Sequence, residues 1–356
     1  MNELSFDASH PARMPCNLQD RDTIFILLAT YNGATFLQAL LNSLNDQDDA
    51  NWILLVRDDG STDQTRQFLQ IFAQTQPKMR WVLDNFGRLG VTKSFEHLMR
   101  AALGQGANFF ALCDQDDVWL PRKLAELRAA LCHDQEGGFQ AIDPEPALAY
   151  SDLTVVDADL KLKSHSFFKM NHSGGAWRNP SYWLLSHNLV PGCAMLGNRA
   201  LIERSLPFPN ESVIHDWWLL LCAASMGRVA VVDHPLILYR QHGQNTIGVQ
   251  SLGQKMWKFL TGLSLQCTEK QSIFVASVLQ AGALSRRLKP ELEQERRWRD
   301  VIAAMSAGLL ASSRWRRLWA VFFGQVRRVG LARNVLLICT VWRLRTVPKL
   351  QGGTQN

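Results

Sequence analysis

The first 130 residues alternate between short apolar runs and amphipathic segments, and this alternation limits the folds open to the chain. Residues 23–31 form an apolar run typical of a buried strand, and residues 34–44 then place leucine and phenylalanine at helical spacing. Strand and helix repeated in this way predict a parallel sheet with helices packed against it. We therefore expect an α/β fold with a mostly parallel central sheet.

The same alternation continues to about residue 232, and the pattern from residue 252 onward is helical. We expect a polar N-terminal segment at 1–22, one α/β domain at 23–248, and a helical, basic region at 249–356. The predicted strands are 23–31, 51–59, 80–83, 108–113, 148–156, 190–196 and 229–232, and the predicted helices are 34–44, 64–73, 92–103, 121–131 and 216–226.

Three polar clusters follow predicted strands at their carboxyl ends. They are ATYNG at 29–33, RDDGSTD at 57–63 and DQDD at 114–117. Ligands of parallel α/β sheets bind outside the carboxyl ends of the strands. Unrelated surface loops would have no reason to gather at one edge, so this arrangement predicts a site there.

The third cluster brings together three acids, Asp114, Asp116 and Asp117, directly after an apolar run. Carboxylates this close repel one another unless a cation neutralises them, and Mg²⁺ binds one or two carboxylates together with substrate phosphates. The alternative is a capped turn whose acids favour the positive end of the helix at 121–131. By itself, D-x-D is a weak signal.

Taken together, the clusters resemble a known family. LLATYNGATFLQALLNSL, LLVRDDGSTDQT and LCDQDDVW, in this order, resemble the motifs of the family 2 glycosyltransferases, which have the GT-A fold. The resemblance extends to about Gly248. It implies a hexosyltransferase that binds a nucleotide-sugar donor, with the D-x-D loop holding a metal ion and the donor diphosphate.

The resemblance also implies roles for residues in the first two clusters. Thr30, Tyr31 and Asn32 match the turn that packs around the nucleotide. Asp59 matches the acid that accepts a hydrogen bond from the pyrimidine imide N–H, which suits a carboxylate. Its neighbour Asp58 is expected in the same pocket. The alternative for both acids is an Asx-turn cap.

Further donor contacts are expected from the segment at 85–95 and from the acidic loop. Arg88 and Lys93 could offset phosphate charge, although such cations are also common on solvated surfaces. Gln115 and Asp117 could contact the donor sugar or diphosphate, or Asp117 could cap the next helix. Arg240, in the late YRQHGQN segment, is expected near the diphosphate.

The expected metal ligands are Asp114, Asp116 and His242, with Asp116 the direct one. In some GT-A enzymes a late histidine completes the metal shell, and imidazole is a reasonable third ligand. A surface histidine is the alternative for His242. Both Mg²⁺ and Mn²⁺ take oxygen ligands, so the sequence leaves the metal open between them.

An inverting transfer needs a base that takes the proton from the acceptor hydroxyl, and this base is usually a carboxylate. Residues 214–220, IHDWWLL, match the family's acidic pair at the start of a helix. Asp216 is therefore the predicted catalytic base. The alternative is an acid that only favours the helix N-terminus. Trp217 and Trp218 are expected to pack in the core.

HDWWLLLCAASMG and YRQHGQN, with LCDQDDVWLP, resemble the branch that adds L-rhamnose to cell-surface polysaccharides such as O-antigen. This resemblance implies a dTDP-L-rhamnose donor, with a UDP-sugar as the alternative. It also implies an acceptor glycan linked to a polyprenyl diphosphate.

Charge is divided unevenly along the chain. Residues 251–356 hold 18 Lys and Arg against 5 Asp and Glu, whereas residues 1–250 hold 20 against 27. Arginine alternates with tryptophan, phenylalanine and leucine over 312–345, as in helices that lie in a membrane interface. The alternatives are a helical cap on the catalytic domain and nucleic-acid binding, and we expect no nucleic acid because no such motif is present.

The rest of the composition predicts a cytoplasmic location, peripheral on the inner face of the cell membrane. The seven cysteines include no CxxC pair, which fits a reducing compartment. No apolar run reaches the roughly 18 residues that a membrane span requires. Two rival functions are a nucleotidyltransferase acting on sugar phosphates and a non-catalytic protein that binds a nucleotide sugar or lipid within an assembly.

Overall fold

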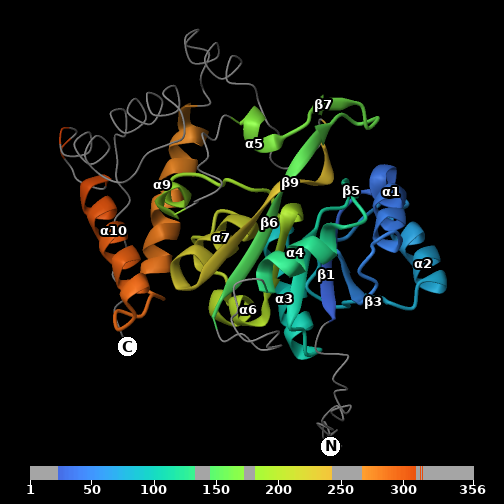
Figure 1. Cartoon of the computed structure of the whole chain (residues 1–356), viewed down its shortest axis with the longest axis horizontal. Coiled ribbons are helices and arrows are strands. Elements are labelled where there is room, and N and C mark those ends of the chain that lie inside the picture. Colours follow the sequence, from blue (N-terminus) through green and yellow to red (C-terminus); the bar gives the residue numbers. More distant parts are fainter. Residues whose placement is uncertain are drawn as a thin grey trace, which may run out of the picture.

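The structure is a computed structural model of the 356-residue chain. It describes residues 23–132, 145–171, 181–242 and 267–309, together with residues 313 and 315. Figure 1 shows a central sheet with helices packed along it and a pair of helices, α9 and α10, side by side at one flank.

The strands lie in a single nine-stranded sheet. They are β1 (Ile24–Thr30), β2 (Trp52–Asp58), β3 (Met79–Trp81), β4 (Phe109–Cys113), β5 (Val118–Trp119), β6 (Ala147–Val156), β7 (Leu162–Ser164), β8 (Met195–Asn198) and β9 (Arg228–Arg240).

The α-helices of the described residues include all five that the sequence predicted. They are α1 (Ala34–Asn45), α2 (Thr65–Thr75), α3 (Val91–Gly104), α4 (Lys123–Cys132), α5 (Phe167–Met170), α6 (Arg199–Ser205), α7 (His215–Met226), α9 (Cys267–Ser285) and α10 (Glu293–Leu309). Two short 3₁₀ helices, η2 (Ser181–Leu185) and η3 (Gly192–Ala194), precede β8.

The strand order is β3-β2-β1-β4-β8-β6-β9-β5, with β7 paired to β6. The pairings give β1, β2, β3, β4, β6 and β9 one direction, and β5, β7 and β8 the opposite one. Strands β1, β2 and β4 are nearly continuous apolar runs because both of their faces are covered. The predicted α/β fold with a mostly parallel sheet is confirmed.

Two predicted strands differ from the structure. The prediction of a strand at 190–196 was wrong in its first part, where Gly192–Ala194 form a 3₁₀ turn and the strand begins only at Met195. The strand predicted at 229–232 continues to Arg240. Pro235 lacks an N–H for the ladder, and the structure places it at an irregularity in the pairing of β9 with β6.

The two C-terminal helices of the described residues pack on the α/β domain. The guanidinium of Arg204, at the end of α6, lies 2.8 Å from the carboxylate of Glu295 on α10. Gln280 on α9 accepts a hydrogen bond of 2.7 Å from the backbone of Val213, just before α7. None of the helices in the described part of the chain combines the length and the apolar character needed to cross a bilayer. The membrane-interface helix and the helical cap were expected for residues 312–345, and apart from Ser313 and Trp315 these lie outside the described residues.

Candidate active site

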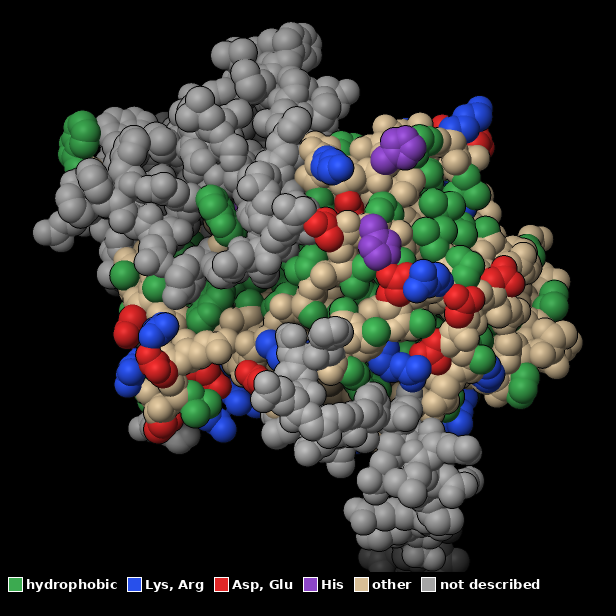
Figure 2. Space-filling view, viewed as in Figure 1, with side chains coloured by type: hydrophobic (Ala, Val, Ile, Leu, Met, Phe, Trp, Pro, Cys, Tyr) green, Lys and Arg blue, Asp and Glu red, His purple; other side chains and the backbone are tan. Residues whose placement is uncertain are grey.

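The three polar clusters lie at one edge of the sheet. β1 pairs in parallel with β2 and with β4, so that Thr30 lies opposite Asp58 and Leu28 lies opposite Cys113. The loops that follow these strands therefore leave the sheet on the same side, as the sequence predicted. Figure 2 shows acidic and histidine side chains close together on this face, near the positions of β5 and β9 in Figure 1.

The turn after β1 is held by the loop after β4. Gln115 Oε1 accepts a hydrogen bond of 2.9 Å from the N–H of Tyr31, and Gln115 Nε2 donates one of 3.0 Å to the carbonyl of Tyr31. Gly33 leaves room for this amide, because a Cβ at position 33 would lie 2.2 Å from Gln115 Oε1. Gln115, predicted as a donor contact, thus also joins two walls of the site.

The turns after β1 and β2 are joined by a second set of hydrogen bonds. Thr30 Oγ1 donates to Asp58 Oδ1 at 3.0 Å, and the N–H of Asn32 donates to Ser61 Oγ at 2.9 Å. Asn32 Oδ1 accepts from the N–H of Thr62 at 2.8 Å. Asn32 has a φ of +49°, a left-handed conformation that asparagine adopts more readily than most residues. These bonds give Thr30 and Asn32 a structural task; their contact with a nucleotide stays a prediction.

Asp58 closes the turn after β2. Its Oδ1 also accepts from the hydroxyl of Ser61 at 2.5 Å, and its Oδ2 accepts from the N–H of Ser61 at 3.0 Å. Arg66 Nε lies 2.8 Å from the same Oδ2. The protein itself therefore supplies Asp58 with several donors, in the manner of the turn cap that was the alternative for this acid.

Asp59 is oriented by backbone N–H groups from the loop before α3. Its Oδ1 accepts from Leu89 at 2.7 Å and its Oδ2 from Gly90 at 2.8 Å, and Arg57 Nη1 lies 2.5 Å from Oδ1. Burial favours a raised pKa, but the hydrogen bonds from Leu89, Arg57 and Gly90 outweigh it and lower the pKa of Asp59. Asp59 is thus an ionised acceptor, and the acceptance of an imide N–H stays a prediction.

Arg57 is a buried cation that the motif comparison did not single out. Its guanidinium is 2% exposed and forms an ion pair with Asp84 at 2.7 Å as well as with Asp59. It also donates to Ser94 Oγ at 2.9 Å and to the carbonyl of Gly87 at 2.8 Å. The signal in the sequence was a charged residue inside the apolar run WILLV-R-D. Arg57 connects β2 to the whole loop before α3.

The two cations predicted to offset phosphate charge have different surroundings. The guanidinium of Arg88 lies over the ring of Tyr31, with its carbon 4.0 Å from the ring centre. Lys93 Nζ instead lies 2.7 Å from Glu96 Oε2 on its own helix, with 46% of its side chain exposed. Arg88 is therefore next to the turn predicted to bind the nucleotide, whereas Lys93 is already paired on the surface of α3.

Asp116 and His242 come together across the site. His242 Nε2 lies 2.8 Å from Asp116 Oδ2, and its ring packs against Phe36 with 4.6 Å between ring centres. Both side chains retain partial exposure. Two of the three predicted metal ligands, separated by 126 positions in the chain, are thus neighbours.

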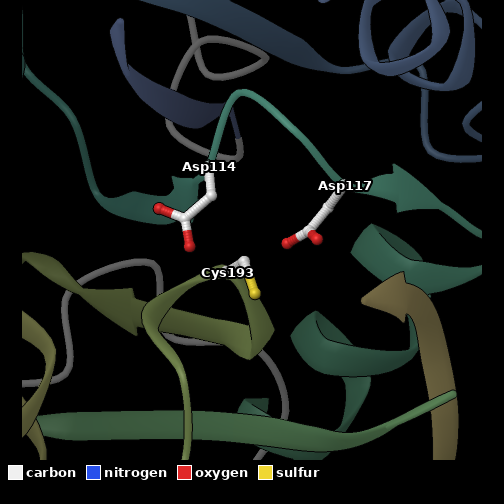
Figure 3. Close-up of side chains that lie close together, drawn as sticks. All are labelled: Asp114, Asp117 and Cys193. Carbon is white, nitrogen blue, oxygen red and sulfur yellow. The ribbon is translucent and has the colours of Figure 1, made fainter. Parts of the chain in front are cut away.

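The other two acids of the loop turn inward. Figure 3 shows the carboxylates of Asp114 and Asp117 and the thiol of Cys193, on η3, pointing toward a common space. One ligand atom from each of the three lies within 4.8 Å of the others. Burial, and then the charges of Asp116 and Asp216, raise the pKa of Asp114 to about 7. Asp117 is completely buried, and the same effects raise its pKa well above the ordinary range.

Arg240 forms hydrogen bonds with the acidic loop. Its backbone N–H donates to Asp117 Oδ1 at 2.9 Å, and its Nε donates to the carbonyl of Asp116 at 2.8 Å. Its Nη1 donates to the carbonyl of Ala158, and the guanidinium lies over the ring of Phe36 at 4.5 Å. Since Arg240 is 4% exposed, the structure gives it the task of positioning the loop. The predicted contact with the diphosphate stays a prediction.

Asp216 begins α7 with its carboxylate fixed on both oxygens. Oδ2 accepts from the N–H of Gly192 at 2.9 Å, and Oδ1 accepts from the N–H of Trp217 at 2.6 Å. Burial raises the pKa of Asp216 to about 6, although these bonds and one from Asn188 oppose the rise. Gly192, whose N–H binds Asp216, precedes Cys193, whose thiol faces Asp114 and Asp117, so the predicted base lies next to the predicted metal loop.

The residues that flank Asp216 belong to the core. Trp217 and Trp218 are buried, and their indole N–H groups donate to the carbonyls of Leu184 and Ser205 at 2.6 and 3.0 Å, as the expected core role requires. His215 stacks on Phe95 with ring centres 4.0 Å apart, and burial lowers its pKa to about 3. His215 is therefore neutral and serves to pack α7 against α3.

The comparison with known proteins agrees with this geometry. Residues 25–169 match the family model described as glycosyl transferase family 2. The chain is 23% identical to the dTDP-rhamnosyl transferase RfbG of Shigella flexneri, over 71% of this chain and 84% of that protein. It is 33% identical, over 28% of this chain and 38% of that protein, to the UDP-Glc:alpha-D-GlcNAc-diphosphoundecaprenol beta-1,3-glucosyltransferase WfgD of Escherichia coli.

Among solved structures, the crystal structure of TarS from S. aureus resembles the fold. The TM-score is 0.50 at 18% identity, and the match covers 84% of this chain and 48% of that one. This likeness concerns the fold alone. Together with the sheet topology, it agrees with the predicted GT-A architecture.

Proposed function

Because residues 25–169 form a glycosyl transferase family 2 domain and the protein is a glycosyltransferase with a nucleotide-sugar donor, we propose a specific reaction for it. The reaction is a metal-dependent, inverting transfer of L-rhamnose from dTDP-L-rhamnose to a hydroxyl of a growing surface polysaccharide. The observation that carries this proposal is geometric. Asp216 is bound to Gly192, the next residue Cys193 faces Asp114, and the Asp116–His242 pair lies in the same loop region.

Asp216 acts in this proposal as the general base. Its carboxylate is held by the N–H groups of Gly192 and Trp217, so it points in one direction without a substrate. With a pKa of about 6, Asp216 is still mostly ionised at neutral pH, and it is a stronger base than an ordinary aspartate. The acceptor hydroxyl gives its proton to Asp216 as its oxygen attacks the anomeric carbon from the side opposite the leaving diphosphate.

The residues present fit a hard divalent cation. Asp116 and His242 offer an oxygen and a nitrogen ligand that already face each other. Asp114 belongs to the same loop as Asp116, and its carboxylate faces Asp117 and Cys193. Mg²⁺ and Mn²⁺ both accept such a set. A cation bound there would neutralise the donor diphosphate and stabilise the departing nucleotide.

The choice of rhamnose follows from two observations. The motifs around Asp216 and His242 resemble those of the rhamnose-transferring branch, and RfbG, which resembles this chain over most of its length, is named as a dTDP-rhamnosyl transferase. A UDP-linked sugar is the second candidate, because WfgD is named as a UDP-Glc enzyme.

A lipid-linked acceptor and a peripheral place on the inner face of the membrane complete the proposal. The name of WfgD includes a diphosphoundecaprenol acceptor. Residues 251–356 carry the excess of basic charge, and cationic side chains near anionic lipid contribute about 1 kcal/mol each. Attraction of these basic residues to anionic lipid would bring the active site to a glycan carried by a polyprenyl diphosphate.

A donor screen tests the proposal. Purified protein is mixed with a panel of nucleotide sugars and Mg²⁺ or Mn²⁺, and the unfolding temperature and slow donor hydrolysis are measured. We expect stabilisation by dTDP-L-rhamnose only when metal is present, and loss of this effect in Asp116→Ala. Glu291→Ala, which removes an exposed acid just before α10, is the charge-matched control and should behave as wild type.

The outcomes separate the parts of the proposal. A UDP- or GDP-sugar that stabilises the protein better than dTDP-L-rhamnose would overturn the rhamnose assignment and leave the mechanism standing. Equal stabilisation with and without metal, or an Asp116→Ala protein that responds like wild type, would overturn the metal assignment.

A further inference from the structure

Lys123, the first residue of α4, is buried beneath the acidic loop. Its side chain is completely inaccessible to solvent, and its ammonium group lies 2.8 Å from the centre of the Trp119 ring. Within the described residues, Nζ has no hydrogen-bond partner. A buried ammonium group without a hydrogen bond is costly, so other groups must stabilise it.

The ionisable groups that interact electrostatically with Lys123 are carboxylates and thiols. Cys113 lies at the end of β4, Cys193 on η3, and Asp114 and Asp117 in the loop between β4 and β5. Burial lowers the pKa of Lys123 to about 7, while these four groups act in the opposite direction. The ring of Trp119 also offers Lys123 a cation–π contact.

Asp117 is a buried acid whose charge also needs compensation. It is completely buried, and its Oδ2 receives no hydrogen bond from a nitrogen or oxygen donor among the described residues. A carboxylate and an ammonium group within electrostatic range compensate each other in a medium of low dielectric constant. The pair of Lys123 and Asp117 carries no net charge, whether both groups are ionised or both are neutral. Each residue therefore offsets the charge of the other.

We propose that Lys123 is the resident counter-cation of the acidic loop, a positioning residue that compensates Asp114 and Asp117 and leaves Asp116 and His242 to bind the divalent metal. In this arrangement the ammonium group of Lys123 compensates the negative charge of the inward cluster of Asp114, Asp117 and Cys193. The loop keeps its shape when metal and nucleotide leave after each turnover. The part of this inference that concerns metal affinity rests on the proposed function, whereas the compensation of the carboxylates does not.

The first experiment measures stability without metal. In excess EDTA, the unfolding temperature is compared for wild type, Lys123→Met, Asp117→Asn and the double variant. Each single change should lower the unfolding temperature, because it leaves one buried group uncompensated. The double variant should be more stable than the sum of the single losses predicts, because it removes both groups at once. Additive losses, or a double variant that fails to fold, would overturn the proposal.

The second experiment measures Mn²⁺ binding by titration calorimetry without any donor. Lys123→Met should bind Mn²⁺ on the order of tenfold more tightly than wild type, about 1.4 kcal/mol, because a cation near the ligands is gone. The Lys123→Met/Asp117→Asn protein should return close to the wild-type affinity. A lysine that only fills space would leave the affinity unchanged or weaken it in both variants, and either result would exclude the counter-cation role.

The two experiments fail in different ways. If wild type does not bind Mn²⁺ at all, the metal-dependent function fails, and the stability measurements in EDTA still decide the role of Lys123. If Mn²⁺ affinity falls in both Lys123→Met and Cys193→Ala, the inward cluster is itself the metal site, and the assignment of its cation to Lys123 is wrong.

Discussion

His242 Nε2 lies 2.8 Å from Asp116 Oδ2, although 126 positions separate the two residues in the chain. The contact links the loop after β4 to the end of β9, and Arg240 strengthens the same link through the carbonyl of Asp116. The loop after β4 and the segment after β9 thus hold the oxygen and nitrogen atoms that the proposed metal site requires next to each other.

Replacing His242 by alanine tests this pair. We expect His242→Ala to weaken Mn²⁺ binding on the order of 10- to 100-fold, because a ligand is lost while Asp116 remains. Titration calorimetry and the metal-dependent shift of the unfolding temperature measure the effect. His234→Ala, which removes an exposed histidine of β9 paired with Glu126 on α4, is the matched control. Equal Mn²⁺ affinity in His242→Ala and wild type would show that the ring only supports the loop.

The Asp216→Asn variant should separate binding from chemistry. We expect kcat to fall about 10²- to 10⁴-fold, the usual contribution of a general base, with little change in donor affinity. An amide keeps the shape of the side chain and can still accept the N–H of Gly192. Steady-state transfer assays and donor titrations measure the two quantities. A variant that retains near-normal transfer would exclude Asp216 as the base.

The pH dependence of transfer follows from the same residue. Burial raises the pKa of Asp216 to about 6, and the base is active only when ionised, so kcat/KM should rise with pH and level off above about pH 6. Saturating metal is needed, because the pKa of Asp114 is raised to about 7 and its protonation would otherwise weaken metal binding. The folded protein holds the Asp216 proton more tightly than the unfolded chain, so this group's contribution to stability declines as the pH rises through the interval from about 4 to 6. A rate profile that is flat from pH 5 to 8 would contradict the assignment.

Gly33 should be sensitive even to a single methyl group. In Gly33→Ala the new Cβ would lie 2.2 Å from Gln115 Oε1, so the amide must move and lose both hydrogen bonds to Tyr31. We expect a loss of about 1–2 kcal/mol in the free energy of unfolding, measured by urea denaturation. Gln115→Ala should cost a similar amount, and the double variant should cost little more than either. Fully additive losses would mean that Gly33→Ala destabilises the protein by some route other than the loss of the hydrogen bonds between Gln115 and Tyr31.

The buried Arg57 should be far more important for stability than an exposed arginine nearby. Arg57→Met leaves the carboxylates of Asp59 and Asp84 buried without their partner, and we expect a loss of about 3–5 kcal/mol. Arg66→Met, which breaks an ion pair whose arginine is 59% exposed, should cost at most about 1 kcal/mol. Urea denaturation of both variants measures the difference. Similar losses would refute the ranking.

The sequence alone determined the fold class and the edge of the sheet that carries the site. Apolar runs such as FILLAT in β1 can only be buried strands, and a polar cluster directly after each run must leave the sheet at its carboxyl end. The sequence therefore predicts Thr30, Asp59 and the acidic loop on one edge of the sheet. This prediction holds because strand direction and periodicity are local properties of the chain.

The tertiary structure determined which polar side chains face the site and which ones hold its loops in place. Within DQDD, Asp116 turns outward to His242 while Asp117 turns inward toward Asp114 and Cys193, and the spacing of the acids contains no sign of this difference. Arg240 and Gln115, expected at the donor, are engaged in holding loops together. Burial and partners that come from distant segments set these roles, and with them the pKa of each acid. Neighbouring residues in a sequence carry no record of such long-range contacts.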